Sequence, residues 1–151
     1  MKQVKKSVLL WYSAHEMYAL VTAFEDYPKF LPWCERAEVL ERDEHGLTAR
    51  LHLAYMGLRH AFTTRNTYVP DQSVEIGLVD GPFSLLDGTW RFVPLPEPGQ
   101  AEAKGCKIEF EMRYAFANGP LERLISPVFD RIANTFVDAF VKRAEQVYGT
   151  R

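Results

Sequence analysis

The sequence predicts an α+β fold in which a curved antiparallel sheet wraps around one long C-terminal helix. Two observations carry this prediction. Between Cys34 and Ala117 apolar and polar residues alternate, which is the pattern of strands with one buried face. From Leu121 to Tyr148 the apolar residues instead recur every three or four positions, as in an amphipathic helix. One sheet and one long helix are therefore expected to pack face to face.

A strand, a short helix and an aromatic connector are predicted ahead of this region. Residues 2–11 alternate like a strand. Ser13, with Glu16 three residues later, forms a capping-box pattern that opens a short helix ending at about Thr22. Residues 26–33 combine two prolines with four large apolar residues, so they allow no more than one short helical turn.

Five breaks divide the alternating region into six strands in hairpin succession. The last strand is the clearest, because apolar and charged residues alternate without interruption from Cys106 to Arg113. We interpret the proline-rich break as a hairpin loop and not a linker, so residues 1–151 are expected to form one domain. The breaks fall near residues 43–46, 56–57, 69–72, 80–82 and 94–99.

The start of the long helix has two interpretations. Ser126-Pro127 looks like an N-cap followed by the first helical residue, so the preceding turn is either separate, kinked or part of the helix. Even from Pro127 to Tyr148 the helix would be about 33 Å long. A helix covers only about 10 to 12 Å of width, whereas seven strands about 4.8 Å apart span nearly three times that. We therefore expect the sheet to curve and to leave space for a ligand beside the helix.

Composition and charge exclude several classes of protein. The chain has 47% hydrophobic and 25% charged residues, as in soluble globular proteins, and no apolar run long enough to cross a bilayer. The first residues lead into a strand and do not resemble a signal peptide, so we expect a cytoplasmic protein. A net charge of -2 gives no overall attraction to phosphate backbones, and DNA is not an expected partner.

The sequence contains none of the common catalytic or metal-binding patterns. Its four histidines lack HxxxH or HExxH spacing, and Cys34 and Cys106 do not form a CxxC pair. Neither a GxSxG nucleophile motif nor a glycine-rich phosphate loop occurs. We therefore predict a protein that is not an enzyme, with no metal, no cofactor and two reduced, mostly buried thiols.

Residues 27–34, YPKFLPWC, resemble the YPxFLPWC signature of the coenzyme Q-binding and polyketide-cyclase-like branch of the START superfamily. The resemblance continues through residues 80–83, 88–92 and 140–149 and covers nearly the whole chain. It implies a helix-grip fold, in which a curved sheet grips a long helix. It also implies binding of ubiquinone or other lipids in support of respiration. Bacterial members are called ribosome association toxins, and "oligoketide cyclase" is an older label.

The expected function is non-catalytic binding or transport of a hydrophobic ligand, most simply ubiquinone or a related polyisoprenoid lipid. The ligand would be cargo and not a cofactor, and transient contact with a membrane surface, peripheral to the inner membrane, is compatible with this role. One alternative is a ribosome association toxin that binds the large ribosomal subunit and blocks subunit joining. A polyketide cyclase or aromatase, acting by shaping a flexible chain, is another. Local support for ribosome binding comes only from Lys2, Lys5, Lys6, Lys142, Arg143 and Arg151, which are equally typical of a solvated surface.

The candidate ligand-binding residues are those predicted to face the space between sheet and helix. The aromatic residues of the connector are equally compatible with packing as core at the open end of the sheet and with controlling ligand entry. Each candidate on the helix is more typical of a core residue than of a ligand-binding residue. His60, Thr64 and Asn66 share the inward register, and buried polar groups need a protein, water or head-group partner. The candidates are Tyr27, Phe30, Leu31, Trp33, His60, Phe62, Asn66, Tyr68, Trp90, Phe92, Phe110, Met112, Tyr114, Phe129, Ile132, Phe136 and Phe140.

Overall fold

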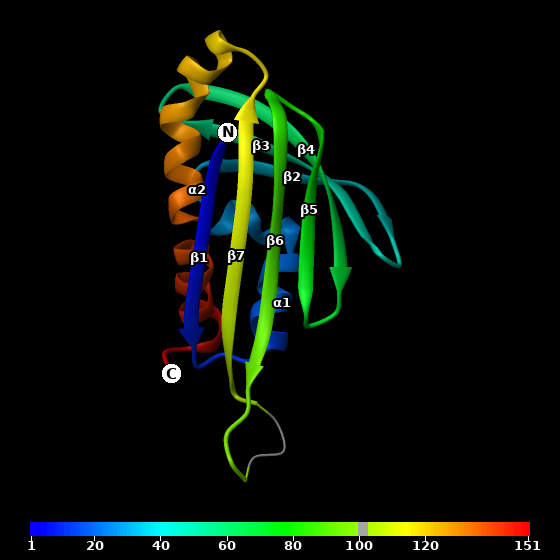
Figure 1. Cartoon of the computed structure of the whole chain (residues 1–151), viewed down its shortest axis with the longest axis vertical. Helices are drawn as coiled ribbons and strands as arrows, with labels where there is room; N and C mark the ends of the chain where they lie inside the picture. Colours follow the sequence, from blue (N-terminus) through cyan, green and yellow to red (C-terminus); the bar gives the residue numbers. More distant parts are fainter. Residues whose placement is uncertain (100–102) are drawn as a thin grey trace.

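The computed structural model describes residues 1–99 and 103–151 and has the predicted α+β fold (Figure 1). Its seven strands form one antiparallel sheet in the order β1-β7-β6-β5-β4-β3-β2. The strands are β1 (Lys2–Leu10), β2 (Cys34–Asp43), β3 (Gly46–Tyr55), β4 (Leu58–Val69), β5 (Ser73–Asp80), β6 (Phe83–Leu95) and β7 (Gly105–Phe116). The helices are α1 (Ala14–Thr22), the short 3-10 helix η1 (Phe24–Lys29) and α2 (Gly119–Tyr148).

The elements before β2 form where the sequence predicts them. The Ser13 hydroxyl accepts a hydrogen bond from the Glu16 N–H at 3.0 Å, and the Glu16 carboxylate accepts one from the Ser13 N–H at 2.9 Å. This reciprocal pair is the predicted capping box at the start of α1. In η1, the buried Tyr27 hydroxyl donates a hydrogen bond to the Val21 carbonyl at 2.5 Å, which fastens the connector to α1. β1 ends at Leu10, one residue earlier than expected.

Helix α2 begins at Gly119 and continues to Tyr148, so the alternative start at Pro127 is wrong. Asn118 caps the helix, because its side-chain oxygen accepts a hydrogen bond from the Leu121 N–H at 2.9 Å. Pro127 lies inside the helix and lacks an N–H to donate to the preceding turn. At 30 residues the helix is about 45 Å long and runs beside β1 and β7 (Figure 1).

The sheet is strongly curved, and three elements cover its concave face. Strands β1, β6 and β7 run along the long axis of the molecule, whereas β2 and β3 cross it (Figure 1). Register shifts interrupt three strand pairings, those between β2 and β3, between β4 and β5 and between β6 and β7, and such bulges bend and twist strands. Besides α2, α1 contacts β6 and β7, and η1 contacts β2. The expectation that one helix alone covers the sheet is therefore wrong.

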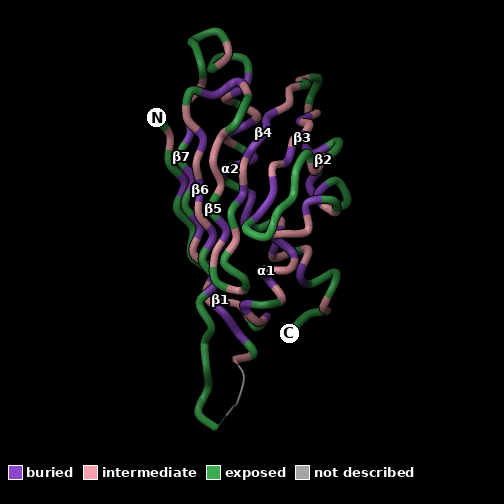
Figure 2. The backbone as a smooth tube through the Cα atoms, turned by 90° about the vertical axis from the view of Figure 1, so that its right-hand side faces the viewer, coloured by how far each residue is buried: buried purple, intermediate pink, exposed green. Residues whose placement is uncertain are grey.

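Aromatic side chains occupy much of the space between the sheet and the long helix, where we expected room for a ligand. Trp90, which is fully buried, has its ring centroid 4.6 Å from that of Phe110 and 5.3 Å from that of Phe140. Phe129 is centred 4.8 Å from both Phe83 and Tyr114. At these separations the rings are in contact. Buried residues alternate with more exposed ones along β6 and β7, which places one face of these strands in the core (Figure 2).

A partly buried polar network ties β1 and β7 to α2. The Asp130 carboxylate accepts hydrogen bonds from the Lys2 ammonium and the Tyr114 hydroxyl, both at 2.5 Å, and from the Ser126 hydroxyl at 3.1 Å. Burial alone would raise the pKa of Asp130. The bonds from these three groups outweigh that effect, so its pKa lies below the ordinary value of 3.8.

We predict that Asp130→Asn lowers the free energy of unfolding by about 1 kcal/mol at neutral pH, because these groups are only partly shielded from water. A depressed folded-state pKa contributes stability above the unfolded pKa, and that contribution is lost as pH falls through the folded value. The difference between wild type and variant in urea unfolding should therefore shrink below about pH 4. Asp138→Asn, at an exposed position on the same helix, is the control. A constant difference across this range would contradict the assignment.

Candidate functional site

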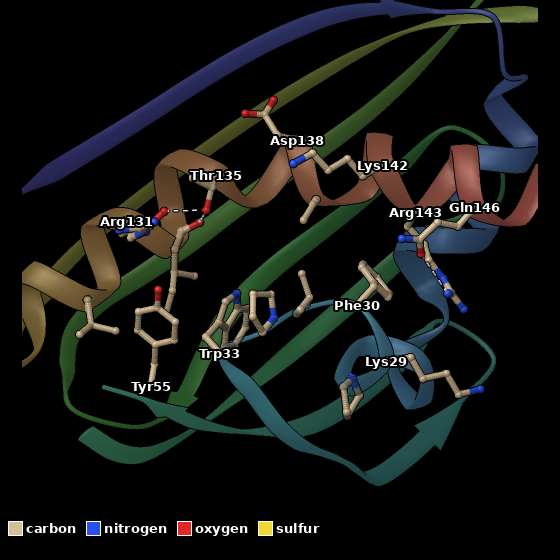
Figure 3. A pocket seen from close by; sticks show the side chains of 16 residues that line it. Lys29, Phe30, Trp33, Tyr55, Arg131, Thr135, Asp138, Lys142, Arg143 and Gln146 are labelled. Carbon is tan, nitrogen blue, oxygen red and sulfur yellow. Dashed lines mark hydrogen bonds between the residues drawn. The ribbon is translucent and has the colours of Figure 1, made fainter. Parts of the chain in front are cut away.

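An open groove of about 640 Å³ lies between α2 and the connector (Figure 3). Residues 128–146 of α2 supply one wall, residues 28–33 supply the other, and Tyr55 at the end of β3 completes the lining. The prolines at positions 28 and 32 limit the conformations of the second wall. The lining residues are Pro28, Lys29, Phe30, Leu31, Pro32, Trp33, Tyr55, Val128, Arg131, Ile132, Thr135, Asp138, Ala139, Lys142, Arg143 and Gln146.

The inner part of the groove is apolar and continuous with the core. Leu31 is 1% exposed and Trp33 is 6% exposed, so both present only a small part of their surface to the groove. The Trp33 ring is centred 6.4 Å from that of Phe136, and Phe30 is centred 5.1 Å from Phe140. Because these rings pack onto the interior cluster, the wall is held by the same contacts that hold the helix against the sheet.

The rim of the groove is mainly basic. Lys29, Arg131, Lys142 and Arg143 line it together with one acidic residue, Asp138. The Arg143 guanidinium lies 5.2 Å from the centre of the Phe30 ring, a distance at which a cation is attracted to an aromatic face. The groove therefore combines apolar walls with a cationic border.

Four of the predicted ligand-binding residues line this groove: Phe30, Leu31, Trp33 and Ile132. The others lie outside its lining, on the concave side of the sheet, in η1 or on the inner face of α2, and their contact with a ligand stays a prediction. Of these, His60 and Tyr68 are half-buried. The buried ones are Tyr27, Phe62, Asn66, Trp90, Phe92, Phe110, Met112, Tyr114, Phe129, Phe136 and Phe140.

Sequence reasoning missed most of the α2 wall. Val128, Ile132, Thr135 and Ala139 follow one another at spacings of four, three and four, so they share a helix face next to the core stripe. That spacing could have been used to predict the wall from the sequence. The position of Arg131 and Lys142 beside the connector could not be predicted in this way, because it depends on how α2 packs in three dimensions.

Two buried oxygens on or near the concave side lack a hydrogen-bond partner among the described residues: Asn66 Oδ1 and the Tyr68 hydroxyl. Both belong to β4, and the Tyr68 ring makes an edge contact with Tyr18 at 6.2 Å. An unpaired buried polar group costs about 1 to 3 kcal/mol, so both oxygens favour a bound water or ligand group. Neither residue lines the groove.

Neither cysteine thiol is activated, and the described residues hold no metal-binding cluster. Burial raises the pKa of the Cys34 thiol to about 11, and it does the same for Cys106, so both thiols are protonated near neutral pH. Among residues 1–99 and 103–151, no three histidine, cysteine, aspartate or glutamate side chains gather in a way that could hold a metal ion. In the same part of the chain, no helix is long and apolar enough to cross a membrane.

A curved seven-stranded sheet that holds a long C-terminal helix, with a groove opening beside that helix, defines a protein of the helix-grip class. A family model described as polyketide cyclase / dehydrase and lipid transport matches residues 10–141. The chain belongs to this family, which confirms the resemblance seen in residues 27–34.

Individual relatives carry different names. The ribosome association toxin RatA of Pseudomonas aeruginosa is 41% identical and covers 97% of both chains. The mitochondrial coenzyme Q-binding protein COQ10 homolog B of Xenopus laevis is 28% identical, over 97% of this chain and 59% of its own. The Zhui aromatase/cyclase from Streptomyces has a similar structure, with a TM-score of 0.80, 16% identity and 99% coverage of both chains. At that identity the likeness shows the fold alone.

We predict that the two aromatic residues of the groove wall differ in their contribution to stability. Trp33→Ala should lower the free energy of unfolding by about 3 to 5 kcal/mol, because the ring is almost fully buried against Phe136. Phe30→Ala should cost about 1 to 2 kcal/mol, since Phe30 is only half-buried. Chemical denaturation of both variants measures the difference. Equal losses would show that the wall is not anchored at Trp33.

Proposed function

We propose that this protein binds a hydrophobic ligand in the groove between α2 and the connector, without catalysing a reaction. The observation that carries the proposal is the groove itself, with apolar walls at Phe30, Leu31 and Ile132 and a volume of about 640 Å³. This volume falls in the range of small-molecule sites. Of the relatives named above, the coenzyme Q-binding protein is the one whose name supports binding of a hydrophobic ligand.

The ligand class that fits best is a quinone with an apolar tail, such as ubiquinone, or a related polyisoprenoid lipid. A flat ring can pack against the Phe30 ring, and a hydrocarbon tail can follow the apolar part of the α2 wall towards Tyr55 (Figure 3). The coenzyme Q-binding relative, at 28% identity, supports this choice.

Filling the groove should weaken ligand binding while leaving the fold intact. Ala139 is half-buried in the α2 wall, so the indole introduced by Ala139→Trp would occupy the space between α2 and Phe30. We expect its affinity for a short-chain ubiquinone analogue, measured by calorimetric titration, to fall about tenfold or more.

Glu145→Trp is the matched control, because it places the same side chain at an exposed position of α2 outside the groove lining. It should bind like the wild type. If wild-type protein takes up no quinone analogue, and no apolar molecule co-purifies with it in native mass spectrometry, the binding proposal is wrong. Equal affinities of wild type and Ala139→Trp would instead place the ligand elsewhere.

Ribosome association is the second candidate function, favoured by the 41% identity to the ribosome association toxin over 97% of both chains. The structure reduces the number of basic residues that are free to contact ribosomal RNA. Lys2, Lys5 and Arg151 form ion pairs with Asp130, Glu111 and Glu16. Among the described residues, Lys6, Lys142 and Arg143 are left without such a pair and are available for phosphate groups. The cyclase alternative rests on the family description alone.

Under this second function the protein should co-sediment with large ribosomal subunits at low salt and dissociate as salt rises, because phosphate contacts release counterions. Sucrose-gradient fractions probed for the protein measure this. Absence from the ribosomal fractions at low salt would eliminate the candidate, and salt-insensitive binding would show that these basic residues do not carry it.

A further inference from the structure

Three of the four cations on the rim of the groove take part in no ion pair among the described residues. Lys29 is paired with Asp26 at 2.8 Å, and Arg143 lies over the Phe30 ring. Within the described parts of the chain, Arg131 and Lys142 form no ion pair, and both are exposed. Figure 3 shows Arg131 near one end of the groove, and Lys29 and Arg143 near the other. Positive charge therefore borders the opening although the whole chain has a net charge of -2.

Two exposed apolar side chains lie at the end of the groove marked by Tyr55. Met56, next to Tyr55 at the tip of the β3–β4 turn, is 83% exposed. Leu124, four residues before the groove residue Val128, lies one turn further along the same side of α2 and is 56% exposed. Neither side chain is buried by the fold, so both are free to enter an apolar environment outside the protein.

We propose that the groove face, defined as Lys29, Met56, Leu124, Arg131, Lys142 and Arg143, docks on the surface of an anionic phospholipid bilayer, with the groove opening towards the lipid. This inference deepens the proposed ligand binding, because it names the source from which an apolar cargo enters. Cations around the groove meet lipid phosphates, and Met56 and Leu124 insert between head groups. A cargo could then pass between bilayer and groove without crossing water.

The mixture of charge and apolar surface favours a bilayer over nucleic acid as the partner of this face. Phosphates of RNA would satisfy Arg131 and Lys142, but they would leave Met56 and Leu124 against a polar backbone. A bilayer satisfies both kinds of side chain at once, since its head groups are charged and its acyl region is apolar.

Vesicle flotation tests the docking face directly. Wild-type protein should float with vesicles of phosphatidylcholine and phosphatidylglycerol in equal parts, should not float with phosphatidylcholine alone, and should be released by salt. The double variant Arg131→Gln/Lys142→Gln should bind the anionic vesicles roughly thirty-fold more weakly, since each near-surface cation contributes roughly a five-fold factor. Met56→Ser should weaken binding by severalfold without changing the salt dependence.

Arg91→Gln/Lys104→Gln is the matched control. It changes the net charge by the same amount at exposed residues of β6 and of the segment before β7, outside the groove lining. It should bind vesicles like the wild type, and circular dichroism should show that all variants are folded. If both double variants lost the same amount of vesicle binding, the loss would follow from net charge alone, and the assignment of this face would be overturned.

The same samples separate failure of docking from failure of cargo binding. Uptake of a short-chain ubiquinone analogue dispersed in buffer needs no membrane. If wild type takes up the analogue but does not float with anionic vesicles, the docking inference is wrong and the proposed function stands. If Arg131→Gln/Lys142→Gln loses ribosome co-sedimentation while wild type never floats, the face binds RNA and the bilayer proposal is overturned.

Discussion

The contact between the inner face of α2 and the concave face of the sheet is the constraint on which the rest of the structure depends. Phe129, Phe136 and Phe140 meet aromatic rings of β6 and β7 at contact distances, and the Asp130 network joins the same helix to β1 and β7. Burial of several aromatic side chains outweighs any single hydrogen bond in such an interface. The helix is therefore fixed against the sheet, and space for a ligand is found along its flank.

The position of the groove follows from that packing. The connector is tied to α1 by Tyr27 and to the interior by Trp33, so it forms a firm wall opposite the flank of α2. Small or short side chains at Thr135 and Ala139 leave the helix side of this wall open. One short segment thus contributes both to the core and to the groove. The two interpretations of the connector, as core and as part of a ligand site, therefore describe different faces of the same residues.

The periodicity of the sequence was sufficient to predict the order of strands and helices, because strand and helix patterns differ and each hairpin has a turn signal. The start of the long helix and the space beside it were harder to predict, for physical reasons. Ser126-Pro127 and Asn118-Gly119-Pro120 both look like helix starts, and only packing decides between them. The sequence-based estimate of open space between sheet and helix left out the cover provided by α1 and η1 and the packed rings of Trp90 and Phe110. The basic rim could not be predicted, since Arg131 and Lys142 look like solvated helix residues until the connector is placed beside them.

A crystal structure of the protein with a bound short-chain ubiquinone tests the central claim most directly. The account predicts density for the ring between the connector and α2, beside Phe30 and Ala139, with the aromatic cluster around Trp90 unchanged. Density for the ring within that cluster, between α2 and the sheet, would contradict it and restore an interior chamber as the site of binding.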